Sequence, residues 1–272
     1  HGGLCNRYRV LASLLQFANR FENVTVIWNI NSELGCAFDA LFKVPQTDNV
    51  SVVSCRRRRL VTRAMRSLGR FAFRVAGGPW RYYGDIDLKG LQYEAMERML
   101  TENSSTLVKV CTCTKLPRPC FGLLEPNAQI VERARRFEAM RPALRACIGV
   151  HIRGRDHKGS RQVSPPEAFK KRIARELEAD GSVQFFVACD EAYIVEELSQ
   201  EFGAKIMSFE KRSLGRGSEQ GIVDAFVDVL LLSRTRRIYG SYNSSFGETA
   251  ACIGRIPFEW VTVNPSPSGE AQ

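Results

Sequence analysis

Short apolar segments alternate with amphipathic ones along most of this 272-residue chain. The alternation is clearest in the second half, where amphipathic periodicity predicts helices at 166–179, 191–202, 221–234 and 245–253. Strands are predicted around them at 146–152, 183–188, 205–209, 237–242 and 258–263. Strands that are apolar nearly throughout, such as 183–188, belong to a parallel sheet covered on both faces. The pattern therefore predicts an α/β fold with a doubly wound sheet.

The first half follows the same alternation less regularly. It predicts strands at 24–30, 50–54 and 107–113 and helices at 8–21, 60–76, 88–102 and 127–139. We expect two Rossmann-like domains, residues 1–140 and 141–272, with a ligand cleft between them; one larger α/β domain is the alternative. The chain opens on a Gly-rich turn that a strand would normally precede, so we expect the first strand to be missing. Functional side chains should follow the carboxyl ends of strands.

The basic residues are concentrated in one segment. The net charge is +10, and residues 55–84 hold nine Arg and no acidic residue. Five of these Arg keep within about 80° of one helix face, and they are Arg59, Arg63, Arg66, Arg70 and Arg74. We expect this face to dock on an anionic membrane surface or on the acceptor, with plain solvated surface as the alternative. A nucleic-acid partner is not expected, because aromatic residues do not interleave with the Arg in a stacking pattern and no standard binding motif occurs.

The apolar runs and the cysteines exclude several other classes of protein. No apolar run approaches the roughly 18 to 20 residues of a membrane span. The nine Cys are scattered, and we interpret most of them as core thiols. Cys111, Cys113 and Cys120 form the only local cluster, and zinc would need a further ligand, so no metal is expected.

The cell location is left open by the sequence. Its four N-glycosylation sequons matter only in a secretory lumen. A cytoplasmic, membrane-peripheral location is favoured, and the Golgi or ER lumen fits if an N-terminal anchor exists.

Titratable side chains gather directly after the predicted strand 146–152. Six of them occupy the eight positions from 151 to 158. His151 and Arg153 face the same side of an extended chain, so an imidazole and a guanidinium converge on one anion, and Asp156 can hold the Arg or take a proton. Phosphate is the anion that a guanidinium fork suits best. A solvated loop with a satisfied histidine is the alternative.

Three further segments carry candidate polar groups. Ser244 or Ser245 follows the strand 237–242 and could cap the next helix with Glu248, where the helix N-terminus would also bind an anion. Asp190 and Glu191 follow the strand 183–188, where either could accept a hydrogen bond from a ribose or a guanine, or simply favour a helix N-terminus. Asn6 and Arg7 follow a Gly-Gly turn into a helix, and Asn6 could equally be the N-cap.

Taken together, these segments resemble one family. Gly2-Gly-Leu-Cys-Asn-Arg7, His151-Ile-Arg-Gly-Arg-Asp156, Asp228-Val-Leu-Leu-Leu-Ser233 and Gly240-Ser-Tyr-Asn-Ser-Ser245 look like the motifs of GDP-fucose-dependent fucosyltransferases with an H-x-R-x-x-D sequence. The branches are the α1,6-, α1,2- and protein O-fucosyltransferases. The resemblance implies a GT-B-like architecture, inverting transfer of fucose from GDP-fucose to a glycan or other hydroxyl acceptor, and no required metal or other cofactor.

The same resemblance implies roles for individual residues. Arg153 would neutralise the β-phosphate of the leaving GDP, with His151 and Asp156 shaping the same pocket as catalytic residues. The donor would be bound by the N-terminal and C-terminal segments together, through Asn6, Arg7, Arg155, Asp190, Asp228, Ser244 and Ser245. In these roles Asn6 lies beside the sugar, Asp190 near the guanosine and Ser244 at a phosphate.

Two positions depart from the family pattern. Gly154 replaces a second consecutive Arg, with Arg155 as the candidate substitute, and Arg161 replaces a Glu ten residues after the motif His. The general base is therefore not assigned, and Asp156 and Glu167 are the remaining nearby carboxylates. A sugar-nucleotide-binding protein that has lost its base is thus an alternative to an active transferase.

Overall fold

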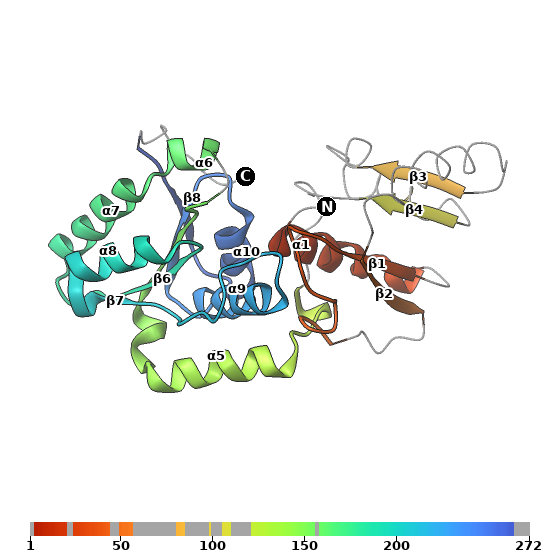
Figure 1. Cartoon of the computed structure of the whole chain (residues 1–272), viewed down its shortest axis with the longest axis horizontal. Helices are drawn as coiled ribbons and strands as arrows, with labels where there is room; N and C mark the ends of the chain where they lie inside the picture. The colour runs from red at the N-terminus through yellow and green to blue at the C-terminus, as the bar shows by residue number, and fades with distance from the viewer. Residues whose placement is uncertain are drawn as a thin grey trace. The chain divides into compact units, whose positions relative to one another are not determined.

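The computed structural model describes residues 3–20, 24–43, 49–56, 80–84, 98, 105–109, 121–155 and 158–263. The chain divides into two compact units, residues 1–127 with 215–222 and residues 128–214 with 223–272 (Figure 1). The helix α5 (Ala128–Met140) therefore belongs to the second unit, whereas the expected division at residue 140 assigned it to the first. Its buried Phe137 explains the difference, since the ring packs on Phe186 of the second unit with the two ring centroids 5.6 Å apart.

The first unit contains two pairs of parallel strands. The pairs are β1 (Val24–Ile30) with β2 (Val50–Arg56), and β3 (Trp80–Gly84) with β4 (Ser105–Lys109). Strand β3 was not predicted. The helix α1 (Leu4–Leu14) begins four residues before the expected helix, and the 3-10 helix η1 (Leu15–Arg20) continues it. A short 3-10 helix, η2 (Phe121–Leu123), follows further along the chain. The predicted helices 60–76 and 88–102 lie outside the described residues apart from Arg98.

The second unit is built on a five-stranded parallel sheet with the order β7-β6-β5-β8-β9. Its strands are β5 (Ile148–Ile152), β6 (Phe185–Cys189), β7 (Ile206–Met207), β8 (Arg237–Ser241) and β9 (Phe258–Val261). The chain runs outward from β5 to β7 and then returns to the other side of β5 with β8. This is the Rossmann strand order, and its direction reverses between β5 and β8. The predicted α/β class is confirmed.

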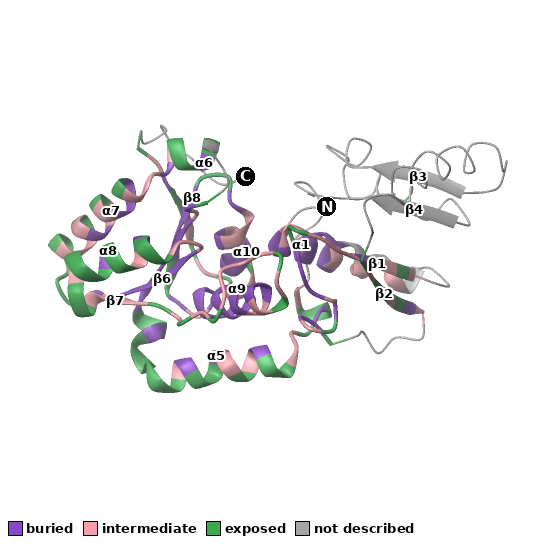
Figure 2. Cartoon of the chain, viewed as in Figure 1, coloured by how far each residue is buried: buried purple, intermediate pink, exposed green. Residues whose placement is uncertain are grey.

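Helices cover both faces of this sheet. They are α6 (Lys158–Val163), α7 (Pro166–Ala179), α8 (Ala192–Phe202), α9 (Glu219–Leu232) and α10 (Ser245–Gly254). Short 3-10 helices, η3 (Pro142–Ala146) and η4 (Gly203–Lys205), precede β5 and β7. Every residue of β5 and β6 is buried, and Figure 2 shows β6 in the purple of buried residues. One face of β5 packs on α7 and α8 through Val150, and the other turns Gly149 toward α9 and His151 toward α10.

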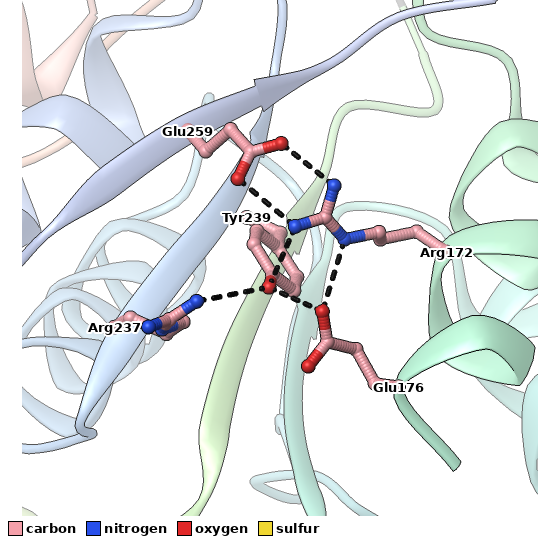
Figure 3. A network of polar contacts seen from close by, with 5 residues as sticks. All are labelled: Arg172, Glu176, Arg237, Tyr239 and Glu259. Atoms are coloured by element: carbon pink, nitrogen blue, oxygen red, sulfur yellow. Dashed lines mark hydrogen bonds and ion pairs between the residues drawn. The ribbon is translucent and has the colours of Figure 1, made fainter. Parts of the chain in front are cut away.

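A polar network ties α7 to β8 and β9. Arg172 binds both carboxylate oxygens of Glu259 at 2.7 and 2.9 Å and donates to the Tyr239 hydroxyl at 2.8 Å (Figure 3). Its guanidinium also stacks over the Tyr239 ring, 4.1 Å from the centroid. The Tyr239 hydroxyl in turn donates to Glu176 at 2.6 Å. Bidentate pairing and stacking both require a planar guanidinium, so this network fixes the position of the edge strand β9.

Most of the cysteines that the structure describes are core residues, as expected. Cys5, Cys36, Cys147 and Cys189 are buried. Burial raises the pKa of the Cys189 thiol to about 12, which keeps it protonated near neutral pH. Among the described residues no helix is long and apolar enough to cross a membrane.

Candidate functional site

The predicted site residues of the second unit lie where the strand order of its sheet reverses. His151 is the residue before the last one of β5, Asp190 directly follows β6, and Ser244 comes shortly after β8. Because β5 and β8 are neighbours whose crossovers leave in opposite directions, their carboxyl ends lie at the position where open α/β sheets bind ligands. The clustering expected from the sequence therefore has a structural basis in the strand order.

The segment after β5 is held by hydrogen bonds from both neighbouring strands. The backbone N–H of Arg153 donates to Ser241 Oγ at 2.9 Å, and the N–H of Gly154 donates to Asp190 Oδ1 at 2.6 Å. His151 is buried with its ring stacked on Phe246, the two centroids 4.6 Å apart. The Arg153 side chain is half-buried at the end of this ordered segment. These bonds fix the backbone from which the guanidinium extends.

Asp190 and Glu191 serve this segment and do not cap α8. Glu191 is the N-cap residue of α8 and makes no side-chain cap hydrogen bond. It accepts a hydrogen bond from Arg155 Nε at 2.9 Å, while Arg155 Nη1 donates to the Leu214 carbonyl at 3.1 Å. The Arg155 guanidinium is thus engaged on two sides, and its substitution for a second motif Arg stays a prediction.

Gly154 leaves no room for that second Arg. A Cβ at this position would lie 2.5 Å from Cγ of Glu191 and 3.0 Å from Cδ1 of Ile194. Any side chain would therefore displace the side chain of Glu191, which pairs with Arg155. The departure from the family pattern at this position is accommodated by local packing.

The turn after β8 leads into the N-terminus of α10. Asn243 adopts a positive φ of 54°, a conformation that Asn tolerates, and Ser244 is the N-cap residue. The expected capping bond is absent: Ser244 Oγ makes no cap hydrogen bond, and it is buried without a partner within the described part of the chain. Ser245 is the first residue of the helix. An unsatisfied hydroxyl beside a helix N-terminus is a suitable group for binding phosphate.

Asp228 lies on α9 and is buried. Its Oδ2 pairs with Lys211 Nζ at 2.8 Å, and Lys211 also donates to the Cys189 carbonyl at 2.6 Å. Asp228 Oδ1 has no hydrogen-bond partner among the residues that the structure describes. Burial raises the pKa of the Asp228 carboxyl to about 6; Lys211 opposes this rise and Asp224 adds to it. Asp228 Oδ1, like Ser244 Oγ, is thus a buried polar atom without a hydrogen-bond partner among the described residues.

Sequence reasoning missed three residues of this arrangement. They are Lys211 and Asp224, which hold the segment between β7 and α9, and Ser241, which orders the Arg153 backbone. Asp224 Oδ2 accepts from the N–H groups of Arg212 and Ser213 at 2.7 and 3.1 Å. Polar residues in the otherwise apolar stretch 222–232 were the available signal for Asp224, because an unpaired buried carboxylate is costly.

The first unit places Asn6 and Arg7 on the first turn of α1. Gly3 is the N-cap, so the alternative that Asn6 is the N-cap is wrong: burial of Leu4 and Cys5 extends the helix toward the Gly turn. Arg7 donates from Nη1 to the Asn29 carbonyl at 2.5 Å and lies over the Trp28 ring at 5.2 Å. Arg7 thus has a structural role here, and a donor-binding role for either residue stays a prediction.

Several predicted residues lie outside the described parts of the chain. They are Asp156, the five docking residues Arg59, Arg63, Arg66, Arg70 and Arg74, and the cluster Cys111, Cys113 and Cys120. Within the described ranges no group of three His, Cys, Asp or Glu residues is arranged to hold a metal. Glu167, the other carboxylate considered as a base, is exposed at the start of α7.

Comparisons with known proteins reveal similarity in structure only. No protein-family model matches the sequence, and no curated protein matches it. Among solved structures, NodZ α-1,6-fucosyltransferase soaked with GDP-fucose is 19% identical, with a TM-score of 0.59 over 93% of this chain and 90% of that one. POFUT1 in complex with GDP is 14% identical, with a TM-score of 0.53 over 96% of both chains. A mutant of Arabidopsis thaliana FUT1 in complex with GDP is 16% identical, with a TM-score of 0.59 over 96% of this chain and 68% of that one.

Proposed function

Because this chain has the fold of fucosyltransferases over more than nine tenths of its length, we propose that it transfers fucose from GDP-fucose to a hydroxyl of a glycan or glycoconjugate, with inversion. The observation that carries the proposal is the coincidence of two features at the strand-order reversal. One is the Arg153 side chain on an ordered backbone; the other is the unsatisfied Ser244 hydroxyl at the α10 N-terminus. Both suit a diphosphate. The neighbours were solved with GDP-fucose or GDP.

The chemistry follows from where charge develops. Breaking the bond between fucose and phosphate leaves an oxocarbenium-like sugar and places negative charge on the β-phosphate of GDP. Arg153 would stabilise that charge as it forms, and the α10 N-terminus with Ser244 would add hydrogen-bond donors. His151, whose ring stacks on Phe246, would shape the same donor site. The acceptor hydroxyl loses its proton to a base still to be identified, with Asp156 and Glu167 the candidates.

The first experiment is ligand-dependent thermal unfolding with GDP, UDP, ADP and a duplex oligonucleotide. A ligand at 100 times its Kd adds about 2.7 kcal/mol to the stability of the folded state. We expect GDP to raise Tm and the other three to leave it unchanged. Absence of any shift with GDP, or an equal shift with ADP, would contradict the proposal.

A sugar-nucleotide-binding protein without transferase activity is the second candidate, and Arg161 favours it because the family pattern has a Glu there. Both candidates bind GDP, so turnover separates them. Release of GDP from GDP-fucose that depends on an added glycan acceptor supports the transferase. GDP binding without turnover across an acceptor library supports the binding protein.

Activity is expected to persist in EDTA. Arg153 and the helix N-terminus supply positive charge and N–H groups to the diphosphate, which is the task that a divalent cation performs in metal-dependent transferases. The measurement is the initial rate of GDP release without EDTA and with about 5 mM EDTA, a concentration in excess of any trace metal. Loss of the rate in EDTA and its recovery with Mg²⁺ or Mn²⁺ would contradict metal independence.

Peripheral membrane contact through the basic stripe at residues 59–74 also stays a proposal. Its support is the sequence pattern of five Arg on one helix face without acidic neighbours. On the same pattern we propose a cytoplasmic location at a membrane surface.

A further inference from the structure

Two large aromatic side chains are exposed beside the proposed donor site. Tyr242 follows the carboxyl end of β8 and is 41% exposed, and Trp260 of β9 is 44% exposed. Their ring centroids are 5.3 Å apart with an interplanar angle of 68°. The Trp260 ring also makes an edge contact with Phe258, the centroids 6.4 Å apart, and the Phe258 ring lies against Gly240 and Gly247. Large aromatic rings that are exposed and in contact with one another can form a surface for a ligand.

The backbone around both rings is held in place. Tyr242 donates its N–H to Ser164 Oγ at 2.8 Å, and its carbonyl accepts from Ser160 Oγ at 2.8 Å. Ser164 Oγ also donates to the Val261 carbonyl, which follows Trp260 directly. Two buried serines therefore join the Tyr242 turn to β9. This arrangement gives a reason for the short helix α6 and the turn after it, which carry these hydroxyls.

The opposite face of β9 is fixed as well. Glu259, the residue before Trp260, is bound by both terminal nitrogens of Arg172 (Figure 3). Successive residues of a strand point to opposite faces, so the ion pair on the α7 side holds Trp260 on the α10 side. The two rings are thus preorganised, and a ligand that stacks on them loses little free energy in ordering the protein.

The place of the pair points to the ligand. Tyr242 is two residues before Ser244, so the aromatic surface adjoins the turn that we assign to the diphosphate. A pyranose whose ring substituents are equatorial presents a face of C–H bonds, which stack favourably on the negative face of an aromatic ring. The two rings at an open angle suit one sugar ring and its neighbour in an oligosaccharide.

We propose that Tyr242 and Trp260 form an acceptor subsite that binds pyranose rings of an oligosaccharide by stacking. The inference rests on the proposed function, because it takes the adjoining turn as the donor site. The subsite would orient the acceptor chain next to the fucosyl group and would contribute to KM for the acceptor rather than to donor binding.

The test uses two β1,4-linked tetrasaccharides as probes. One is cellotetraose, and the other is the corresponding tetramer of N-acetylglucosamine. Binding is measured by saturation-transfer NMR and titration on the full chain, and GDP binding is measured separately by calorimetry. We expect Trp260→Ala to weaken tetrasaccharide binding at least about tenfold and Tyr242→Ala to weaken it less, with the Kd for GDP changed less than about twofold. Tyr242→Phe should bind like the wild type.

The matched control is Met140→Ala, which removes another exposed apolar side chain, at the end of α5 before β5 begins. It should leave both tetrasaccharide affinities unchanged. Equal binding by wild type and a folded Trp260→Ala variant, or no binding of either probe by the wild type, would overturn the subsite. If the wild type binds the tetrasaccharides through Trp260 but does not bind GDP, the result would instead contradict the proposed donor and leave the sugar subsite supported.

Discussion

Replacing Arg153 with alanine is expected to lower kcat/KM for fucose transfer by about a hundredfold to a thousandfold while the protein remains folded. The guanidinium is the cation that the site offers to the β-phosphate as its charge develops, and removal of such a group typically costs about 3 to 4 kcal/mol of transition-state stabilisation. The fold should survive because Arg153 is half-buried at a strand end and its backbone N–H, which binds Ser241, remains. The measurement is steady-state GDP release, with circular dichroism to check folding.

Two further variants make this result specific. Arg153→Lys keeps the charge but loses the bidentate fork, so it should recover only a small part of the activity. Arg155→Ala removes a guanidinium that is already engaged by Glu191 and the Leu214 carbonyl, and it should lower kcat/KM less than about tenfold. A folded Arg153→Ala variant with near-wild-type turnover would contradict the assignment, and a larger loss at Arg155 would transfer the role to that residue.

The sheet of the second unit could be predicted because its signal is local. Strands such as 183–188 are apolar throughout, and amphipathic segments of helical length separate them, so the α/β class follows without knowledge of any contact. The strand order does not follow in the same way. Whether a crossover continues outward or returns past β5 depends on packing between distant segments, and only the structure reveals that β8 lies beside β5.

The charged cluster at 151–158 was recognisable because titratable residues rarely follow a buried strand without a function. Lys211 was not recognisable in this way. It lies in an irregular polar segment with no period, and its partner Asp228 is 17 positions later on a helix, so only folding brings the two charges together. The same holds for α6, whose polar sequence shows no helical pattern; its Ser160 bonds to the Tyr242 carbonyl.

The sequence and the structure each show a different feature of Asp228. The resemblance to fucosyltransferases assigns it to the donor site, and the structure shows a buried carboxylate with one oxygen paired to Lys211 and the other unsatisfied among the described residues. Keeping a carboxylate ionised in such a place costs free energy. The cost is consistent with a ligand that donates a hydrogen bond to Oδ1, and the guanine base of GDP carries N–H groups of the required kind.

The contribution of Asp228 to stability without ligand should therefore decrease as pH rises from about 4 to 6. Burial raises the pKa of the Asp228 carboxyl from 3.8 to about 6, so in this window the folded chain holds a proton that the unfolded chain has released. Unfolding free energy decreases with pH wherever the folded state binds more protons, here by about 3 kcal/mol in total. Asp228→Asn lacks this titration. The free energy of unfolding of wild type minus that of the variant, from urea titrations at several pH values, should fall across the window and be level above it.

Binding of GDP should change in the opposite direction. A ligand that donates to Oδ1 favours the ionised carboxylate, so the affinity of the wild type for GDP should increase as pH rises through 6. Asp228→Asn should lose about tenfold to a hundredfold in affinity at pH 7, the range for a hydrogen bond to a charged group, and should lack the increase. Calorimetric titration with GDP at pH 5, 6 and 7 measures both. If affinity is independent of pH and the variant binds GDP normally, Asp228 contributes to the fold through Lys211 and does not contact the donor.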